Sequence, residues 1–294
     1  MKAADFDYEC PASIDAVCGR LAEAAGEAKI IAGGQTLVPL MAMRLARPAL
    51  LLDINRIAAL HGIADAGDHV VVRAATRQAA ALAHETVRAR VPLLAKALGF
   101  VGHVQTRNRG TIGGSLAHAD PAAEIVLAAL ALDAEIEARS VSGTRTMALA
   151  GFVTGPMETV LAPAECMTAI RFPVWRDAGA LGTGFQEVSI RQSDFALAAA
   201  AAQVVLDQAG VCRRAAVAVG GADATPTRMA DAEARLIGTR LDDDDIAAAA
   251  SLARAALAPL ADLHASPLYR RRVAGALVAR ALAEAKGEAV RGKG

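Results

Sequence analysis

The sequence predicts an α+β protein of two domains. Three observations support this: a compact strand–helix–strand unit over residues 28–54, a long antiparallel hairpin over 195–219, and a glycine-rich stretch without apolar periodicity at 176–184 that separates them. A chain of 294 residues, 54% of them hydrophobic, is long enough to form the cores of two such domains.

The N-terminal elements are marked by capping residues and glycines. Ser13 is a typical N-cap, the apolar residues after it follow helical spacing, and Gly26 ends that helix. A strand over residues 28–32 leads into a Gly-Gly turn. Thr36 is then placed to cap a helix over 37–45, and the apolar run at 50–54 predicts a buried strand. Residues 28–54 therefore form a β-α-β unit.

The middle of the chain alternates between the apolar spacing of strands and the apolar spacing of helices. It predicts strands at 70–72 and 134–139, helices at 77–88 and 92–100, a polar loop at 102–110 and a hairpin turn at 142–143. Thr76 is expected to cap the first of these helices. Asp120 followed by Pro121 predicts the start of another helix, which runs to about Leu132.

The C-terminal part combines a hairpin with helices. Strands at 195–206 and 211–219 flank a turn, although their high alanine content leaves helices possible. Helices follow at 227–237 and 246–257. Ser266 and Pro267 begin the last helix, which reaches about Lys286.

Two segments pair adjacent glycines with hydroxyl residues and contain no lysine: Ala32-Gly33-Gly34-Gln35-Thr36 and Thr111-Ile112-Gly113-Gly114-Ser115. Glycine permits a positive φ and close approach of a ligand, and successive free N–H groups at such turns bind anions. Together they predict a diphosphate held between two loops, mainly by backbone amides. Read from the glycines alone, a tight turn without a ligand is an equal alternative.

Composition excludes several classes of function. The 31 basic and 31 acidic residues give zero net charge, which provides no basic excess for nucleic acid or a membrane surface. No signal peptide and no apolar run of membrane-spanning length are present, so we expect a cytoplasmic protein without membrane insertion. Cys10, Cys18, Cys166 and Cys212 are not clustered, so the chain should hold neither zinc nor an iron–sulfur cluster of its own.

Longer stretches carry a resemblance to a known family. Its N-terminal signature matches residues 6–8, 32–41 and 51–54, and its central signature matches 107–115 and 117–124. Its C-terminal signature matches 194–198, 264–266 and 269–271. In these stretches the chain resembles the FAD-binding medium subunit of the xanthine dehydrogenase and carbon monoxide dehydrogenase family of molybdenum hydroxylases.

The resemblance implies a fold and a set of partners. The fold would be the vanillyl-alcohol-oxidase, PCMH-type FAD-binding fold at 1–176, with two α+β subdomains at about 1–57 and 58–176. A C-terminal α+β domain at 177–294 would contain an antiparallel sheet with helices. A small subunit would pass electrons from two [2Fe–2S] clusters to FAD, which would pass them to an external acceptor. A large subunit would hold the molybdenum cofactor and oxidise the substrate, in a dimer of heterotrimers.

The resemblance also implies roles for particular residues. The first segment would hold the FAD diphosphate, and the second would form the opposite wall of the site. His118 lies close enough to touch the cofactor, and Asp120 either contacts FAD or serves only as a helix cap. Phe185 either flanks the isoalloxazine or packs in the core. No catalytic or metal-ligating residue is expected, and the cofactor-binding residues are Ala32, Gly33, Gly34, Gln35, Thr36, Leu37, Thr111, Ile112, Gly113, Gly114, Ser115, His118, Asp120 and Phe185.

Two alternatives remain open at this point. A stand-alone flavin reductase of the same fold would need its own nicotinamide and substrate pocket, and the match in the C-terminal part argues against it. A non-catalytic nucleotide-binding or assembly protein would keep the fold and would fail to bind FAD.

Overall fold

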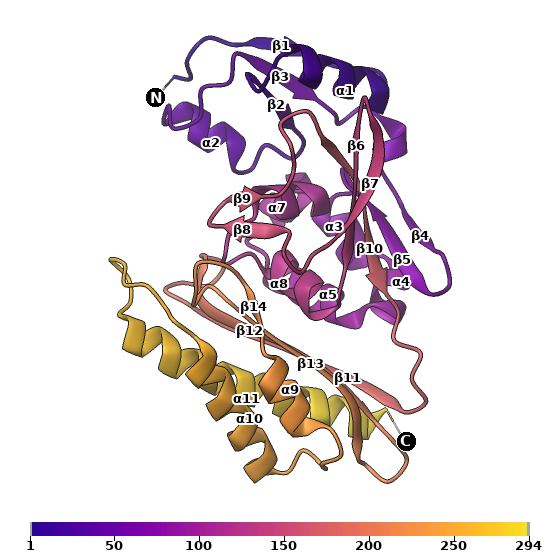
Figure 1. The fold of residues 1–294 in the computed structure, drawn as a ribbon, viewed down its shortest axis with the longest axis vertical. Coiled ribbons are helices and arrows are strands. Elements are labelled where there is room, and N and C mark those ends of the chain that lie inside the picture. The colour runs from indigo at the N-terminus through magenta and orange to yellow at the C-terminus, as the bar shows by residue number, and fades with distance from the viewer. Residues whose placement is uncertain (1, 293–294) are drawn as a thin grey trace.

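The computed structural model describes residues 2–292, and the chain forms three units that follow one another along its long axis (Figure 1). The N-terminal unit lies at one end, a middle unit of one sheet and several helices follows, and a C-terminal sheet with its own helices lies at the other end. No helix among residues 2–292 combines the length and the apolar character needed to cross a membrane.

The N-terminal unit is a small parallel sheet in the order β1-β3-β2. The predicted β-α-β unit is confirmed, and the Ser13 hydroxyl accepts a hydrogen bond from the Ala16 amide at 3.2 Å as the predicted N-cap. Val17 and Leu21 of α1 bury themselves against Leu50 and Leu52 of β3. The elements are β1 (Asp7–Glu9), α1 (Ile14–Glu23), β2 (Ala28–Ile31), α2 (Leu37–Ala42) and β3 (Leu50–Asp53).

The middle unit is an antiparallel sheet in the order β4-β5-β10-β6-β7, with helices packed on one face. Its hairpin turn at 142–143 is confirmed by the pairing of Ser140 with Gly143. The strands are β4 (Ile63–Asp65), β5 (His69–Arg73), β6 (Glu135–Ser140), β7 (Gly143–Ala148), β8 (Val153–Gly155), β9 (Glu158–Thr159) and β10 (Cys166–Pro173). The helices are a 3-10 helix at Ala58–Leu60, α3 (Gln78–Ala83), α4 (Glu85–Arg90), α5 (Pro92–Phe100), α6 (Val104–Arg109), α7 (Ile112–His118) and α8 (Glu124–Ala131).

Three predicted caps in these two units are wrong. Thr36 has helical backbone angles and makes no side-chain cap, so α2 begins without one. Thr76 instead bonds Gly62 through its hydroxyl, with Arg77 at the N-cap of α3. The Asp120 carboxylate accepts a hydrogen bond from the Ala122 amide at 2.8 Å, and α8 begins only at Glu124.

Two predicted boundaries in the middle unit are also corrected. The segment 102–110 is not a loop, because Val104–Arg109 forms the short helix α6. The single helix expected over 77–88 is divided into α3 and α4 at His84, whose backbone is extended. Both differences involve helices of only 6 residues, which are too short to carry a clear apolar periodicity.

The C-terminal unit is an antiparallel sheet in the order β11-β12-β13-β14 with three helices. The predicted hairpin is confirmed as β12 and β13, and Ser266 caps the last helix as predicted. Strand β11 begins at Ala180, inside the stretch that the sequence predicts to be irregular. The elements are β11 (Ala180–Ser189), β12 (Ala196–Leu206), β13 (Cys212–Gly220), β14 (Thr227–Arg228), α9 (Ala230–Leu236), α10 (Asp243–Ala256) and α11 (Pro267–Arg291).

Both faces of this C-terminal sheet are covered. Ala199 and Ala201 of β12 join the core of the middle unit, whereas Ala198, Ala200 and Ala202 join the core formed with α9, α10 and α11. Because successive side chains of a strand point to opposite faces, a run of alanines lets helices approach both sides closely. The middle and C-terminal units therefore share one continuous apolar core.

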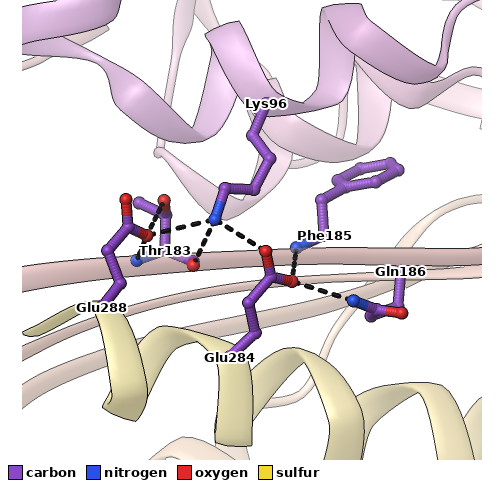
Figure 2. Close-up of polar contacts among 6 residues, drawn as sticks. All are labelled: Lys96, Thr183, Phe185, Gln186, Glu284 and Glu288. Carbon is purple, nitrogen blue, oxygen red and sulfur yellow. Dashed lines mark hydrogen bonds and ion pairs between the residues drawn. The ribbon is translucent and has the colours of Figure 1, made fainter.

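A half-buried polar cluster reinforces this junction (Figure 2). The Lys96 ammonium of α5 donates to the Thr183 carbonyl of β11 at 2.7 Å and to two carboxylates of α11 at 2.8 and 3.1 Å. Those carboxylates in turn accept hydrogen bonds from backbone amides of β11, an edge strand of the sheet. The Lys96 cluster consists of Lys96, Thr183, Phe185, Gln186, Glu284 and Glu288.

Candidate functional site

The structure brings the two glycine segments together. Gly33 is buried against the chain that enters the second segment: a β-carbon added to it would lie 2.4 Å from the Arg109 carbonyl oxygen and 2.8 Å from the Gly110 Cα. Contacts this short exclude any side chain at position 33. The predicted arrangement of two facing loops is therefore present in the fold.

The first segment presents a row of free backbone amides. The Ala32 carbonyl accepts from the Asn55 amide group at 2.7 Å, and the Gly33 carbonyl accepts from the Gln35 side chain at 3.3 Å. The carbonyls of Gly34 and Thr36 accept from the first turns of α2, each at 3.1 Å. Among residues 2–292, none accepts a hydrogen bond from the amide row, which we define as the N–H groups of Gly33, Gly34, Gln35 and Thr36.

This asymmetry gives the loop a positive electrostatic character. Every carbonyl just named is hydrogen-bonded within the protein, while the amide hydrogens have no acceptor there and point elsewhere. Gly34 has a φ of +70°, which allows the chain to curl at this position. Consecutive free amides in such a curl form an anion-binding concavity.

The second segment differs from its prediction. Thr111 caps α7 by accepting the Gly114 amide at 3.0 Å, and the amides of Ile112, Gly113 and Ser115 also bond within the chain. Gly113 is required by close packing on Ala74, whose carbonyl oxygen would lie 2.7 Å from an added β-carbon. The segment therefore offers a wall with the exposed face of Gly114, and not a second row of free amides.

The two predicted polar residues follow this wall. His118 ends α7 at the half-buried surface, and Ala119 beside it has a left-handed backbone that turns the chain. Asp120 then lies on the rim of a cavity, with only one of its oxygens engaged by Ala122. By contrast, Arg107 is engaged internally, because it donates to the carbonyls of Val101 and Gly102 at 2.8 and 2.7 Å.

The cavity lies between the middle and C-terminal units and has a volume of about 600 Å³. Its lining is largely apolar, and Phe195 stands in it with 71% of its surface exposed. An exposed aromatic ring in an apolar cavity suits a planar aromatic ligand. Phe195 is not among the predicted cofactor-binding residues, although it lies inside the C-terminal signature. Other lining residues include Asp120, Pro121, Met157, Ile190, Leu197 and Leu260, together with the charged residues Arg191, Asp194, Asp223, Asp262 and Arg270.

Phe185 does not lie in this cavity. Its side chain is 1% exposed and packs on Phe100 with ring centroids 5.0 Å apart, inside the core shared by two units. Of the two interpretations of Phe185, the structure supports the core residue. Phe195 is instead an exposed aromatic residue that lines the cavity.

Two carboxyl groups at the same junction are ionised with difficulty. Burial raises the pKa of Glu124 to about 7, and the nearby Asp120 adds to this effect. Burial also raises the pKa of Glu187 to about 7, with Glu124 contributing. One oxygen of Glu187 is buried without a hydrogen-bond partner in the part of the chain that the structure describes. These carboxyls therefore retain protons close to neutral pH.

Comparison with known proteins identifies the class of this chain. A family profile described as the FAD binding domain in molybdopterin dehydrogenase matches residues 4–175, and one described as the CO dehydrogenase flavoprotein C-terminal domain matches residues 183–285. These matches define an FAD-binding flavoprotein subunit. The chain belongs to the medium subunits of the xanthine dehydrogenase and carbon monoxide dehydrogenase family.

Individual relatives agree with this assignment along nearly the whole chain. The 6-hydroxypseudooxynicotine dehydrogenase complex subunit alpha of Paenarthrobacter nicotinovorans is 40% identical over 285 residues, which covers 97% of this chain and 96% of the relative. A structure of carbon monoxide dehydrogenase from Hydrogenophaga pseudoflava has a TM-score of 0.94 at 34% identity and covers 98% and 100% of the two chains. Quinoline 2-oxidoreductase from Pseudomonas putida 86 gives 0.93 at 35%, covering 98% and 99%.

These relatives confirm the predicted fold and the predicted cofactor, FAD. They also establish that the chain is one subunit of a multi-subunit oxidoreductase complex, as predicted. The amide row satisfies a simple requirement of that cofactor, since a diphosphate needs donors and the loop offers N–H groups with no acceptor of their own. The residues present therefore fit FAD.

Proposed function

We propose that this chain relays electrons within a molybdenum hydroxylase, from [2Fe–2S] clusters of a small subunit through FAD to an external acceptor. A large subunit with the molybdenum cofactor would oxidise the substrate, in a cytoplasmic dimer of heterotrimers. The observation that carries the proposal is the amide row: four consecutive N–H groups without an internal acceptor, facing a second glycine segment. Bound FAD supplies the redox chemistry, and the protein supplies position and electrostatics.

The residues of this chain would divide the cofactor among them. The diphosphate would lie on the amide row, with Leu37 beginning the helix beyond it and residues 111–115 as the opposite wall. His118 and Asp120 follow that wall toward the cavity, so they would lie along the sugar part. Phe195 would flank the isoalloxazine in the cavity of about 600 Å³. The Asp120 carboxylate would accept hydroxyl hydrogens there.

The apolar lining would also keep water from the ring. Met157, Ile190 and Leu260 lie at the cavity and are exposed in the chain described here. The proposal needs no nucleophile and no general base in this subunit, which agrees with the absence of a predicted catalytic residue.

The test uses the complete complex with its partner subunits. FAD is removed from the complex and then restored, and two rates are measured: substrate oxidation with an artificial acceptor that takes electrons from the molybdenum subunit, and reduction of the physiological acceptor. Without FAD we expect the first rate to persist and the second to fall to background. If acceptor reduction continues at full rate without FAD, the relay function is wrong. Turnover by the isolated chain with a nicotinamide would instead indicate a stand-alone reductase.

A further inference from the structure

Asn55 occupies a position that the proposed function leaves unexplained. It follows β3, and its side-chain NH₂ group donates to the Ala32 carbonyl at 2.7 Å and to the Asp53 carboxylate at 2.7 Å. Its side-chain oxygen accepts a hydrogen bond from the Arg77 guanidinium at 2.7 Å. One half-buried amide thus connects the first glycine segment to a residue of the middle unit.

Arg77 continues the connection to the second segment. Its guanidinium donates to the Arg109 carbonyl, the same oxygen against which Gly33 packs. The backbone beside it is also tied to that segment, because the Gln78 amide donates to the Gly110 carbonyl at 2.9 Å and the Ile112 amide donates to the Thr76 carbonyl at 3.0 Å. Two side chains, those of Asn55 and Arg77, therefore connect the Ala32 carbonyl to the Arg109 carbonyl.

We propose that Asn55 and Arg77, together termed the Asn55–Arg77 latch, are positioning residues that hold the two loops so that the amide row faces the diphosphate. The inference rests on the proposed site for FAD. Neither residue is expected to touch the cofactor. Asn55 binds the carbonyl of a peptide group whose N–H belongs to the amide row, and Arg77 binds the Arg109 carbonyl that packs against Gly33.

The planarity of the peptide bond explains how the latch would work. In a trans peptide the C=O and the following N–H point in opposite directions. When Asn55 holds the Ala32 carbonyl on one side, the Gly33 N–H is directed to the other side. The Gln35 side chain treats the next peptide in the same way by binding the Gly33 carbonyl. The loop is then oriented before any ligand arrives, which lowers the entropy lost on binding.

The surroundings of the latch indicate that it costs free energy to maintain. Burial lowers the pKa of Arg77, and the neighbouring Arg109 lowers it further. Asp53 opposes this effect: hydrogen bonds from Tyr8 and Asn55 outweigh its burial, lower its pKa and keep it anionic. The Arg77 guanidinium is only partly buried. Its placement on the carbonyl beneath Gly33 favours a role in the site.

The test measures FAD binding and stability separately. The full chain is freed of FAD and titrated with FAD by flavin fluorescence, and its thermal unfolding is recorded without the cofactor. We expect Asn55→Ala and Arg77→Met each to weaken FAD binding by about tenfold, the effect of one hydrogen bond with an ionic or strongly polar partner. The double variant should lose less than the product of the two factors, because both residues act in one chain of contacts.

Two conservative variants separate positioning from general stability. Asn55→Asp keeps the acceptor for Arg77 but loses the donor to Ala32, and should bind FAD as weakly as Asn55→Ala. In Arg77→Lys, a single ammonium group replaces the two guanidinium nitrogens that bind Asn55 and Arg109. Its FAD affinity should lie between those of wild type and Arg77→Met. Arg145→Met is the matched control, since Arg145 also binds a carbonyl (Val160, 2.9 Å) and a carboxylate (Glu165) but lies outside both loops. Arg145→Met should change the thermal unfolding of the chain and leave its FAD affinity unchanged.

The outcomes distinguish the latch from the site itself. If the wild-type chain binds FAD and all latch variants bind it within about twofold of wild type, the latch is wrong and the site stands. An equal loss of FAD affinity in Arg145→Met would also overturn the latch, because the effect would then follow stability. If the wild type takes up no FAD, alone or with its partner subunits, the proposed site fails and the latch fails with it.

Discussion

The two junctions of this molecule use backbone groups in opposite ways. At the first glycine segment, side-chain donors from Asn55 and Gln35 bind carbonyls and leave the neighbouring N–H groups free. At the Lys96 cluster, carboxylates of α11 accept hydrogen bonds from the N–H groups of Thr183 and Phe185, and Lys96 donates to the Thr183 carbonyl (Figure 2).

The difference separates a binding surface from a structural contact. The Lys96 cluster satisfies both kinds of backbone group on an edge strand, so it leaves nothing for a ligand and protects the edge from pairing. In the first glycine segment the carbonyls are hydrogen-bonded and the N–H groups are not. The free N–H donors therefore favour an anionic ligand. Counting which backbone groups lack partners therefore distinguishes the two junctions where composition does not.

The largest expected effect removes the contact between the two glycine segments. Gly33→Ala introduces a β-carbon 2.4 Å from the Arg109 carbonyl oxygen, which forces the loops apart. We expect FAD affinity to fall by about a hundredfold or more, or about 2.7 kcal/mol, in a fluorescence titration. Gly99→Ala is the control, because nothing lies within 4 Å of its added β-carbon in α5. Unchanged binding in Gly33→Ala would contradict the facing-loop site.

A second change should affect the other junction alone. Lys96→Met keeps the apolar stem but leaves the carboxylates of Glu284 and Glu288 without their cation. We expect the free energy of unfolding in urea to fall by about 2 kcal/mol, with FAD affinity of the folded chain unchanged. A parallel loss of FAD affinity would mean that the two junctions are not independent.

The smallest expected effect concerns pH. Burial first, and then Glu124, raises the folded-state pKa of Glu187 to about 7, above its value in the unfolded chain. Its neutral form is therefore favoured by folding, so its contribution to stability is full in acid and is lost as the pH rises to about 7. Glu187→Gln should raise the melting temperature relative to wild type more at pH 8 than at pH 5. An equal shift at both pH values would contradict the assigned pKa.

Glu288 provides an internal contrast for that measurement. Burial opposes its ionisation, but hydrogen bonds from Thr183 and Lys96 prevail and lower its pKa. Its contribution to stability is therefore present at neutral pH and lost on acidification, the reverse of Glu187. Glu288→Gln should therefore reduce the loss of stability between neutral and acid pH. It should leave the pH dependence of stability on the alkaline side unchanged.

Local signals in the sequence predicted much of the fold. Ser13 and Ser266 cap their helices because a serine hydroxyl followed by a helical apolar pattern needs no distant partner. The β12–β13 hairpin followed from two long apolar runs around a short turn. Thr76 and Asp120 failed as caps because their side chains bind Gly62 and Ala122 in turns that the sequence does not announce.

Features of the site that depend on distant contacts could not be predicted. Phe185 and Phe195 are both aromatic residues near the C-terminal signature, and only the register of β11 shows that the first points into the core. The glycines of the second segment suggested free amides. Position 113 instead requires glycine because Ala74 packs against it and leaves no room for a side chain. Asn55 and Arg77 belong to no recognisable spacing, since 22 residues separate them.

The order of these contacts along the chain also bears on how the protein is made. All strands of the N-terminal sheet lie within residues 7–53, so that unit can form early during synthesis. Its amide row, however, is bounded by Arg77 and by the backbone at Arg109, which leave the ribosome much later. A nascent chain stopped before residue 109 would contain the sheet without the site. At the proposed site, insertion of the flavin would therefore follow the folding of the middle unit onto the first.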